Sequence, residues 1–275
     1  FASLTPDGKI LDKASTPTPE TLEELLAWLD QRLSEQDYRG IAMSVPGAVH
    51  QETGVIEGIS AIPYIHGFSW YEALAHHQLP VHLENDANCV GLSELLAHPE
   101  IENAACVVIG TGIGGAMIIN GKLHRGRHGL GGEFGYMTTI EPAEKLNNWS
   151  QLASTGNMVR YVIEKSGQSD WNGRKVYQEA AAGNALCQEA IERMNRNLAQ
   201  GLLNIQYLID PDVISLGGSI SQNPDFIKGV QKAVDAFVDR YEEYTIAPVI
   251  QACTYQADAN LYGALVNWLQ EENQW

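Results

Sequence analysis

Residues 105–121 read Ala-Cys-Val-Val-Ile-Gly-Thr-Gly-Ile-Gly-Gly-Ala-Met-Ile-Ile-Asn-Gly. Two apolar runs flank a glycine-rich turn, and the second run closes on Asn120-Gly121, the strongest short signal for a hairpin turn. The pattern predicts two antiparallel strands. Their tip can direct several backbone N–H groups and the Thr111 hydroxyl at one anion, which is the arrangement of a phosphate nest. Taken alone, a hairpin without any ligand is the better interpretation, and the neighbouring motifs decide between the two.

Two other nucleotide-binding motifs compete with this hairpin. Gly110, Gly112 and Gly115 satisfy the G-x-G-x-x-G pattern of dinucleotide sites, but that pattern requires a helix after the glycines. The apolar run 116–119 predicts a strand instead. A Walker loop is excluded because no Gly-Lys-Ser/Thr follows the glycines.

The composition describes an acidic, globular chain. Of the 275 residues 44% are hydrophobic and 19% charged, and 34 acidic side chains against 17 basic ones give a formal net charge of −17. This balance argues against nucleic acid or an anionic membrane as a partner, because both require clustered Lys and Arg. It leaves a nucleotide possible, since a local nest and a metal ion can hold phosphates.

The cysteines indicate neither a zinc site nor a disulfide framework, because they are widely separated and form no C-x-x-C pair. They are Cys89, Cys106, Cys187 and Cys253. No apolar run approaches the roughly 18 residues that predict a membrane span. We therefore expect a cytoplasmic protein without structural zinc.

Alternating strands and helices predict an α/β fold. Residues 1–11 read as two strands joined by a Pro-Asp-Gly turn, and Thr18-Pro19 is expected to begin the first helix, which ends at Leu33. Residues 48–68 are expected to be irregular. Further strands are predicted at 40–45, 80–83, 212–219 and 248–253, and further helices at 69–77, 89–97, 185–209, 224–241 and 260–269. The strand at 40–45 ends in Pro46-Gly47, a turn typical of the crevice edge of an α/β sheet.

A second constellation, Glu84-Asn85-Asp86-Ala87-Asn88, lies between a predicted strand and a predicted helix. In one interpretation Asp86 or Asn85 is only the N-cap of that helix. In the other, the junction lies at the carboxyl end of a strand, where ligand clefts form. Asp86 then accepts a proton from a substrate hydroxyl, and the Asn85 amide holds a neighbouring hydroxyl. The related Asp258-Ala259-Asn260 is interpreted as a helix cap, because no phosphate-type loop follows it.

The loop 124–136 places many glycines around one carboxylate, Glu133, which suggests backbone in close approach to a ligand. Glu133 could hold two hydroxyls of a sugar, or it could be a solvated loop carboxylate. His124 and His128 are near enough in sequence for a metal pair. No third ligand with suitable spacing follows them, so they are interpreted as polar loop residues.

In this order the motifs resemble the ROK family of bacterial sugar kinases, which belongs to the actin/hexokinase-like superfamily. The matching stretches are 84–88, 110–115, 119–126, 132–136, 210–214 and Leu216-Gly217-Gly218-Ser219. The likeness covers nearly the whole chain. It implies an α/β, ribonuclease H-like fold of two lobes with a cleft between them. The smaller lobe is expected to comprise residues 1–105 and 260–275, and the larger lobe residues 106–259.

The resemblance also assigns roles to individual residues. Asp86 is the general base, and the expected sugar ligands are Asn85, Glu133, Gly47 and Tyr136. The expected ATP ligands are Gly110, Thr111 and Gly112 for the phosphates and Gly217 and Gly218 for the adenosine. Mg²⁺ is the implied metal cofactor, and a homodimer is the implied assembly.

Three departures from the family pattern stand out. The family's first phosphate loop, Asp-x-Gly-Gly-Thr, is absent, and we expect a strand and that loop to precede Phe1 in the native protein. Tyr136 replaces the histidine that introduces the zinc-binding cysteines of many relatives, and residues 145–150 contain no cysteine. Ser150 stands where a glutamate usually follows those cysteines. The chain thus resembles a zinc-free branch, and its sugar stays open among glucose, fructose, mannose, an N-acetylated hexosamine and a β-glucoside.

The implied reaction is transfer of a phosphoryl group from ATP to O6 of a hexose, alone or within a larger sugar. A sugar-responsive transcriptional regulator is the alternative, because ROK repressors share this body. Such a regulator requires a basic winged helix-turn-helix, and this acidic sequence contains no segment that could supply one. A third alternative is a sugar-binding protein without catalytic activity.

Overall fold

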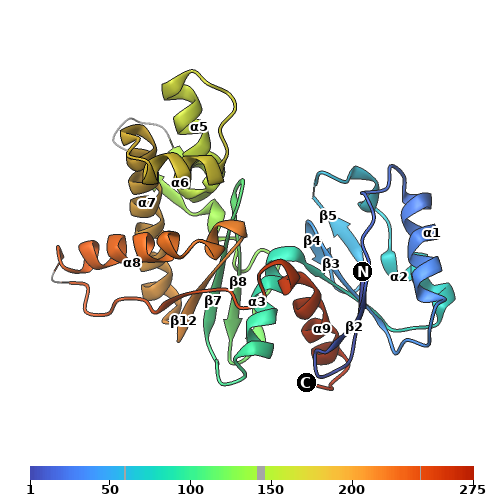
Figure 1. Cartoon of the computed structure of the whole chain (residues 1–275). Helices are drawn as coiled ribbons and strands as arrows, with labels where there is room; N and C mark the ends of the chain where they lie inside the picture. Colours follow the sequence, from blue (N-terminus) through green and yellow to red (C-terminus); the bar gives the residue numbers. More distant parts are fainter. Residues whose placement is uncertain (59, 141–145, 242) are drawn as a thin grey trace.

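The computed structural model describes residues 1–58, 60–140, 146–241 and 243–275. The chain forms two bodies with helices α3 (Asp86–Ala97) and α9 (Ala259–Glu271) between them (Figure 1). Strands β1–β6 and helices α1 and α2 build one body, and β7–β13 with α4–α8 build the other. Within the described residues, no helix combines the length and apolar character needed to cross a membrane.

The larger body is organised on a five-stranded sheet in the order β13-β12-β7-β8-β9. Its strands are β7 (Ala104–Ile109), β8 (Ile113–Ile119), β9 (Lys122–Leu123), β12 (Val213–Gly217) and β13 (Ile250–Ala252). β7, β12 and β13 are parallel, whereas β8 runs antiparallel to both of its neighbours, β7 and β9. The hairpin predicted at 105–121 is thus confirmed. Asn120 and Gly121 both take positive φ, 54° and 69°, as the tightest hairpin turns require.

The larger body also contains the helices α4 (Trp149–Ala153), α5 (Thr155–Ser166), α6 (Gly173–Ala181), α7 (Ala185–Ile209) and α8 (Pro224–Val238). α5 and α6 pack on α7. The long helix α7 has the predicted bounds, and its buried face packs with β7 and β12 in the main core. Gly201 lets the buried Trp149 ring lie against α7, because a Cβ there would come within 2.2 Å of that ring. Helix α7 ends at Asp210, which takes the left-handed conformation.

The smaller body pairs its strands in twos. Its elements are β1 (Ala2–Leu4), β2 (Ile10–Lys13), α1 (Leu22–Leu33), β3 (Ile41–Val45), β4 (Ala48–His50), β5 (Val55–Glu57), η1 (Pro63–Ile65), α2 (Trp70–Leu74), η2 (Ala75–His77) and β6 (Val81–Asn85). β3 and β6 are parallel, and β1-β2 and β4-β5 are antiparallel hairpins. A cavity of about 550 Å³, lined mainly by apolar side chains of β1, α1, β3 and α9, separates β1 from β3.

Three sequence-based expectations are wrong in detail. The first helix is capped by Thr21 rather than Thr18, because Thr21 Oγ1 accepts the Glu24 N–H. The Glu24 carboxylate in turn accepts the N–H of Glu20. Residues 48–68 contain the β4-β5 hairpin and a 3₁₀ turn, so they are more regular than expected. Asp258 precedes α9 without capping it, because its carboxylate pairs with Lys13 instead.

Helices α3 and α9 cross with their backbones in close contact. A Cβ on Gly263 of α9 would lie 1.7 Å from the carbonyl oxygen of Cys89 in α3, so this approach requires glycine. Leu92 and Leu95 of α3 pack against β7 and β8, while α9 packs on β3 and β6. The crossing therefore joins the two bodies, and the lobe boundaries at 105 and 260 stay a prediction.

We predict that Gly263→Ala destabilises the protein. In a helix this change normally stabilises by about 0.5–1 kcal/mol. Here the added methyl group would force α3 and α9 apart, and overpacking of this kind costs about 1–3 kcal/mol. Urea unfolding measures the difference. An unchanged or increased free energy of unfolding would contradict the close crossing.

Candidate active site

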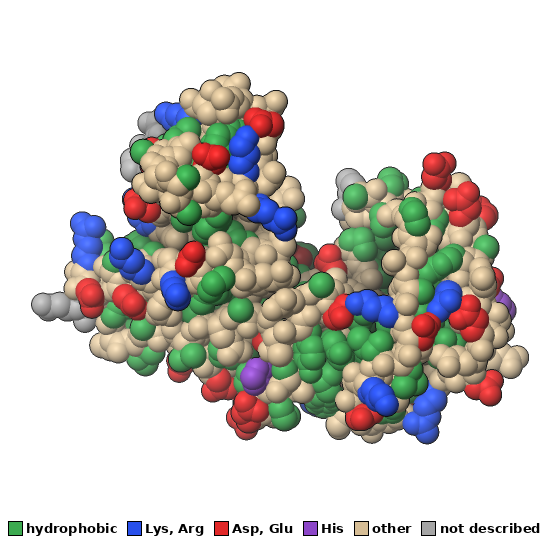
Figure 2. Space-filling model, in the orientation of Figure 1, with side chains coloured by type: hydrophobic (Ala, Val, Ile, Leu, Met, Phe, Trp, Pro, Cys, Tyr) green, Lys and Arg blue, Asp and Glu red, His purple; other side chains and the backbone are tan. Residues whose placement is uncertain are grey.

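The molecule is hollowed between its two bodies (Figure 2). A cavity of about 510 Å³ gathers side chains from the start of α3, the β7-β8 tip and the loop before β10 (Thr138–Ile140). Its lining residues are Asp86, Ala87, Val90, Val108, Gly110, Thr111, Gly112, Ile113, Gly114, Glu133, Gly135, Tyr136, Asn148, Ser150 and Asn260. The structure therefore brings together six of the predicted site residues from three separate stretches of sequence.

The sequence left open whether Asn85 and Asp86 cap α3 or contact a ligand, and the structure gives the two residues different surroundings. Asn85 is the N-cap, because its side-chain oxygen accepts hydrogen bonds from the backbone N–H groups of Ala87 and Asn88. The Asp86 carboxylate accepts the Ala87 N–H and lines the cavity. Partial desolvation by the surrounding protein raises the pKa of Asp86 above its ordinary value of 3.8. Asp86 is therefore available for chemistry while Asn85 holds the helix.

The Asn85 amide also bonds to the turn that follows the neighbouring strand β3. Its Nδ2 donates to the carbonyl oxygen of Gly47 at 3.1 Å, and Gly47 takes the positive φ of 102° that the turn after β3 requires. Neither residue is among those that line the cavity. Their roles as sugar ligands stay predictions, and the bond between them aligns the ends of β3 and β6.

The hairpin tip offers an anion site at the cavity wall. The Gly110 carbonyl accepts the N–H of Gly156 in the first turn of α5, so the tip lies at the positive end of that helix. Among the described residues, no atom lies within 4 Å of a Cβ built on Gly110. Neither Gly110 nor Gly112 takes a positive φ. The fold itself thus does not demand glycine at 110, and the space there is open to a ligand.

Glycines also place Glu133. Gly132 takes a φ of 87°, and a Cβ there would lie 2.9 Å from the Ala116 backbone. Gly135 is tighter still, because its Cβ would meet the Ile113 carbonyl oxygen at 2.0 Å. The loop therefore lies directly on β8 and presents Glu133 to the cavity. Burial raises the pKa of Glu133, and the negative charge of Asp86 raises it further.

The cavity rim carries side chains to which the sequence assigned no site role. Asn148 and Ser150 appeared in the sequence only as departures from the zinc-binding pattern, and Asn260 as part of a helix cap. Ser150 Oγ accepts the Ile113 N–H at 2.8 Å, so it fixes the start of β8. Tyr136 is 72% exposed at this rim. Lys145, the first residue of that departing stretch, lies outside the described residues.

Gly217 and Gly218 end β12 beside the cavity and do not line it. A Cβ on Gly218, whose φ is 89°, would lie 2.1 Å from the Ile109 carbonyl oxygen. Gly217 faces Val90 and Val108, which are lining residues. Their contact with adenosine stays a prediction.

A buried ion pair supports the start of α3, and sequence reasoning missed it. The Glu84 side chain is 2% exposed and accepts bonds from the Asn85 N–H, the Asn88 amide and Arg125 Nε, the last at 2.6 Å. Arg125 also donates to Asn267 and Glu271 of α9. One guanidinium thus connects the loop after β9, the strand that leads to Asp86, and the helix α9.

The model of the ROK family matches residues 1–271. The chain belongs to the ROK family. A β-glucoside kinase of Listeria monocytogenes is 34% identical over 281 residues, which cover 98% of this ROK member and 94% of the relative. The crystal structure of a ROK family protein from Streptococcus pneumoniae TIGR4 in complex with sucrose is 89% identical with a TM-score of 0.98, covering 100% of this chain and 95% of that one.

A ROK hexokinase from Thermus thermophilus has 26% identity and a TM-score of 0.83, over 97% of this chain and 93% of that one. The actin/hexokinase-like α/β fold inferred from the sequence is therefore confirmed for this ROK member. The individual site residues stay predictions that rest on the geometry given above.

We predict that Arg125→Met lowers the free energy of unfolding by about 3 kcal/mol, because it leaves the buried Glu84 carboxylate without its cation. Glu271→Gln is the matched control. It removes the exposed arm of the same network and should cost less than about 1 kcal/mol. Urea unfolding of both variants measures this. Equal losses would mean that the pair with Glu84 is not the dominant one.

Proposed function

We propose that this chain, an ATP-dependent sugar kinase of the ROK family, transfers the γ-phosphoryl group of ATP to O6 of a hexose unit. The observation that carries the proposal is one cavity in which Asp86 and Glu133 face the open Gly110–Gly112 tip. Phosphoryl transfer needs this combination of parts: an acceptor site with a proton-accepting group, placed beside an anion site.

Asp86 is the proposed general base. A sugar hydroxyl is a weak nucleophile while it keeps its proton, and a carboxylate within hydrogen-bond reach orients the oxygen and takes the proton as transfer proceeds. Burial raises the pKa of Asp86, which makes its carboxylate a better proton acceptor than an ordinary aspartate. Glu133, on the adjoining wall, is the proposed ligand of ring hydroxyls.

The Gly110–Gly112 tip is the proposed phosphate site. Its backbone N–H groups and the Thr111 hydroxyl can bind phosphate oxygens, and the positive end of α5 favours their charge. Mg²⁺ prefers oxygen ligands and would be held here chiefly by the phosphate oxygens, because Asp86 and Glu133 face the sugar in this proposal. That ion would neutralise the charge of the transferred group when bound.

We further propose a β-glucoside as the acceptor. The Listeria relative is a β-glucoside kinase, and the Streptococcus relative was solved with a disaccharide, sucrose. When the first sugar ring of a disaccharide lies at Glu133, the exposed Tyr136 ring at the rim can stack on the second sugar ring. A cytoplasmic location, a homodimer and the absence of the cysteine-bound zinc found in many relatives belong to the same proposal.

A coupled ATPase assay against glucose, fructose, mannose, an N-acetylated hexosamine and β-glucosides tests the function. Turnover with β-glucosides above that with glucose supports the proposal. Sugar binding without turnover would instead indicate a regulator body or a binding protein.

Asp86→Asn should lower kcat by roughly 10²–10⁴, the usual effect of a positioned general base. Sugar affinity should change much less, since Glu133 is retained. Measuring kcat, sugar Kd and Tm on this variant decides between a base and a helix cap. Near-normal turnover would contradict the role of Asp86 as base.

Stability and pH give two further readouts for the same variant. The folded-state pKa of Asp86 is raised above 3.8, so stability falls as the pH rises from 3.8 through that pKa, and the full cost of the ionised carboxylate is present above it. Asp86→Asn should therefore leave the Tm at pH 7 unchanged or higher, and Asn85→Ala, which removes the cap, should lower it. In the wild type, kcat should fall as the pH is lowered through the raised pKa, and the variant should lack this limb.

Tyr136→Ala should raise KM for a β-linked disaccharide about five- to tenfold, in line with the loss of one aromatic contact. KM for glucose should stay nearly constant, because glucose does not extend to the rim. Tyr136→Phe is the control that keeps the ring and removes the hydroxyl. Steady-state kinetics with both sugars measures the effect, and an equal rise for glucose would argue against stacking on a second ring.

A further inference from the structure

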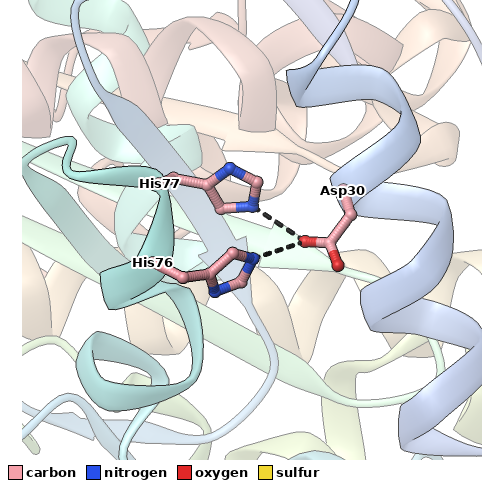
Figure 3. Close-up of side chains that lie close together, drawn as sticks. All are labelled: Asp30, His76 and His77. Atoms are coloured by element: carbon pink, nitrogen blue, oxygen red, sulfur yellow. Dashed lines mark hydrogen bonds and ion pairs between the residues drawn. The ribbon is translucent and has the colours of Figure 1, made fainter.

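A cluster of metal-ligating side chains lies on the smaller body, outside the cleft. Asp30 comes from α1, and His76 and His77 come from the 3₁₀ turn η2 (Figure 3). The Nε2 atoms of His76 and His77 lie 3.0 and 2.8 Å from the same oxygen, Asp30 Oδ1. All three ligand atoms lie within 4.8 Å of one another. In the parts of the chain that the structure describes, these are the three side chains that meet this geometry.

The fold holds the two sides of the cluster independently of the cluster itself. The apolar face of α1, which includes Leu26 and Leu29, packs against the core of the smaller body. Leu74, at the end of α2 directly before η2, is fully buried in that same core. The spacing between Asp30 and the two histidines is therefore set by hydrophobic packing, so the ligands are preorganised.

The charge state also suits a cation. The Asp30 carboxylate oxygen Oδ1 contacts the Nε2 atoms of both histidines, so it can supply the anionic ligand. A neutral imidazole can present a lone pair at Nε2 by moving its proton to Nδ1. The cluster then offers two nitrogens and one anionic oxygen to a single point.

We propose that Asp30, His76 and His77 form a binding site for a divalent transition-metal cation of the zinc class. Two imidazoles and a carboxylate are ligands typical of Zn²⁺, whereas Mg²⁺ prefers an all-oxygen set. Zinc bonds of about 2.0–2.2 Å place tetrahedral ligands roughly 3.4 Å apart, so the two histidine–Asp30 separations need to widen by only about half an ångström.

The site is open and its ion exchangeable. The His76 and Asp30 side chains are 56% and 45% exposed, while that of His77 is 15% exposed. Three protein ligands leave a fourth position for water. The proposed site therefore differs from the closed, cysteine-bound zinc site of many relatives, which the sequence predicts to be absent. Its effect is to connect α1 to η2, which stabilises the smaller body without entering the reaction.

Calorimetric titration of the full chain with ZnCl₂, in buffer containing excess Mg²⁺ and no nucleotide, tests the site. We expect one ion per chain and a Tm that rises with zinc concentration, as ligand binding to the folded state requires. His76→Ala, His77→Ala and Asp30→Asn should each weaken binding at least tenfold. His98→Ala, a matched surface histidine that pairs with Glu100, should leave binding unchanged.

The outcomes separate this site from adventitious binding. Tm values in EDTA verify that each variant folds. If another variant does not fold, His76→Ala, which changes the most exposed ligand, still tests the site. Absence of binding to the wild type, or unchanged affinity in His76→Ala, would overturn the proposal. Loss of stability in Asp30→Asn with no dependence on zinc would identify the cluster as a hydrogen-bonded clamp only. Kinase activity in EDTA-treated protein with added Mg²⁺ should persist, so this test is independent of the proposed reaction.

Discussion

The buried carboxylate of Glu84 is the constraint on which the candidate site depends. A charge removed from water is tolerated only when donors surround it, and here they come from Asn85, Asn88 and Arg125. Each donor belongs to a different part of the architecture: the end of β6, the first turn of α3 and the loop that follows β9. Satisfying one buried charge therefore aligns three segments around Asp86. Arg125 extends the same alignment to α9, so the two bodies share one electrostatic centre.

The start of α3 also divides structural and chemical tasks between neighbours. Asn85 accepts two backbone N–H groups at the helix terminus, whereas Asp86 shares only the Ala87 N–H with it and also lines the cavity. A catalytic group must be positioned by others and not consumed in positioning itself. The glycines of the loop that carries Glu133 act similarly, because they bring the backbone onto β8 and turn the side chain toward the cavity.

Local patterns predicted much of the fold, and long-range pairings set the limit. Turn chemistry and apolar periodicity act between near neighbours, and they predict the hairpin at 105–121, the helix at 185–209 and the positions of the main strands along the chain. The motifs also indicated Asp86, Thr111 and Glu133, which the fold brings to one cavity. The cap at Thr21 competed with an equally good signal at Thr18, and only packing decides between such alternatives. The Lys13–Asp258 pair joins residues 245 positions apart, a relation that no local pattern contains.

The close crossing of α3 and α9 has a mechanical consequence. The contact of Gly263 with Cys89 lies three residues beyond Asp86, about 4.5 Å along the helix axis at 1.5 Å per residue. If the lobes rotate about this contact, Asp86 lies only a short distance from the rotation axis. A rotation of about 10° displaces a point at that radius by only about 0.8 Å, whereas groups several times farther away sweep several times that distance. Rotation about this crossing would therefore leave the proposed base almost in place.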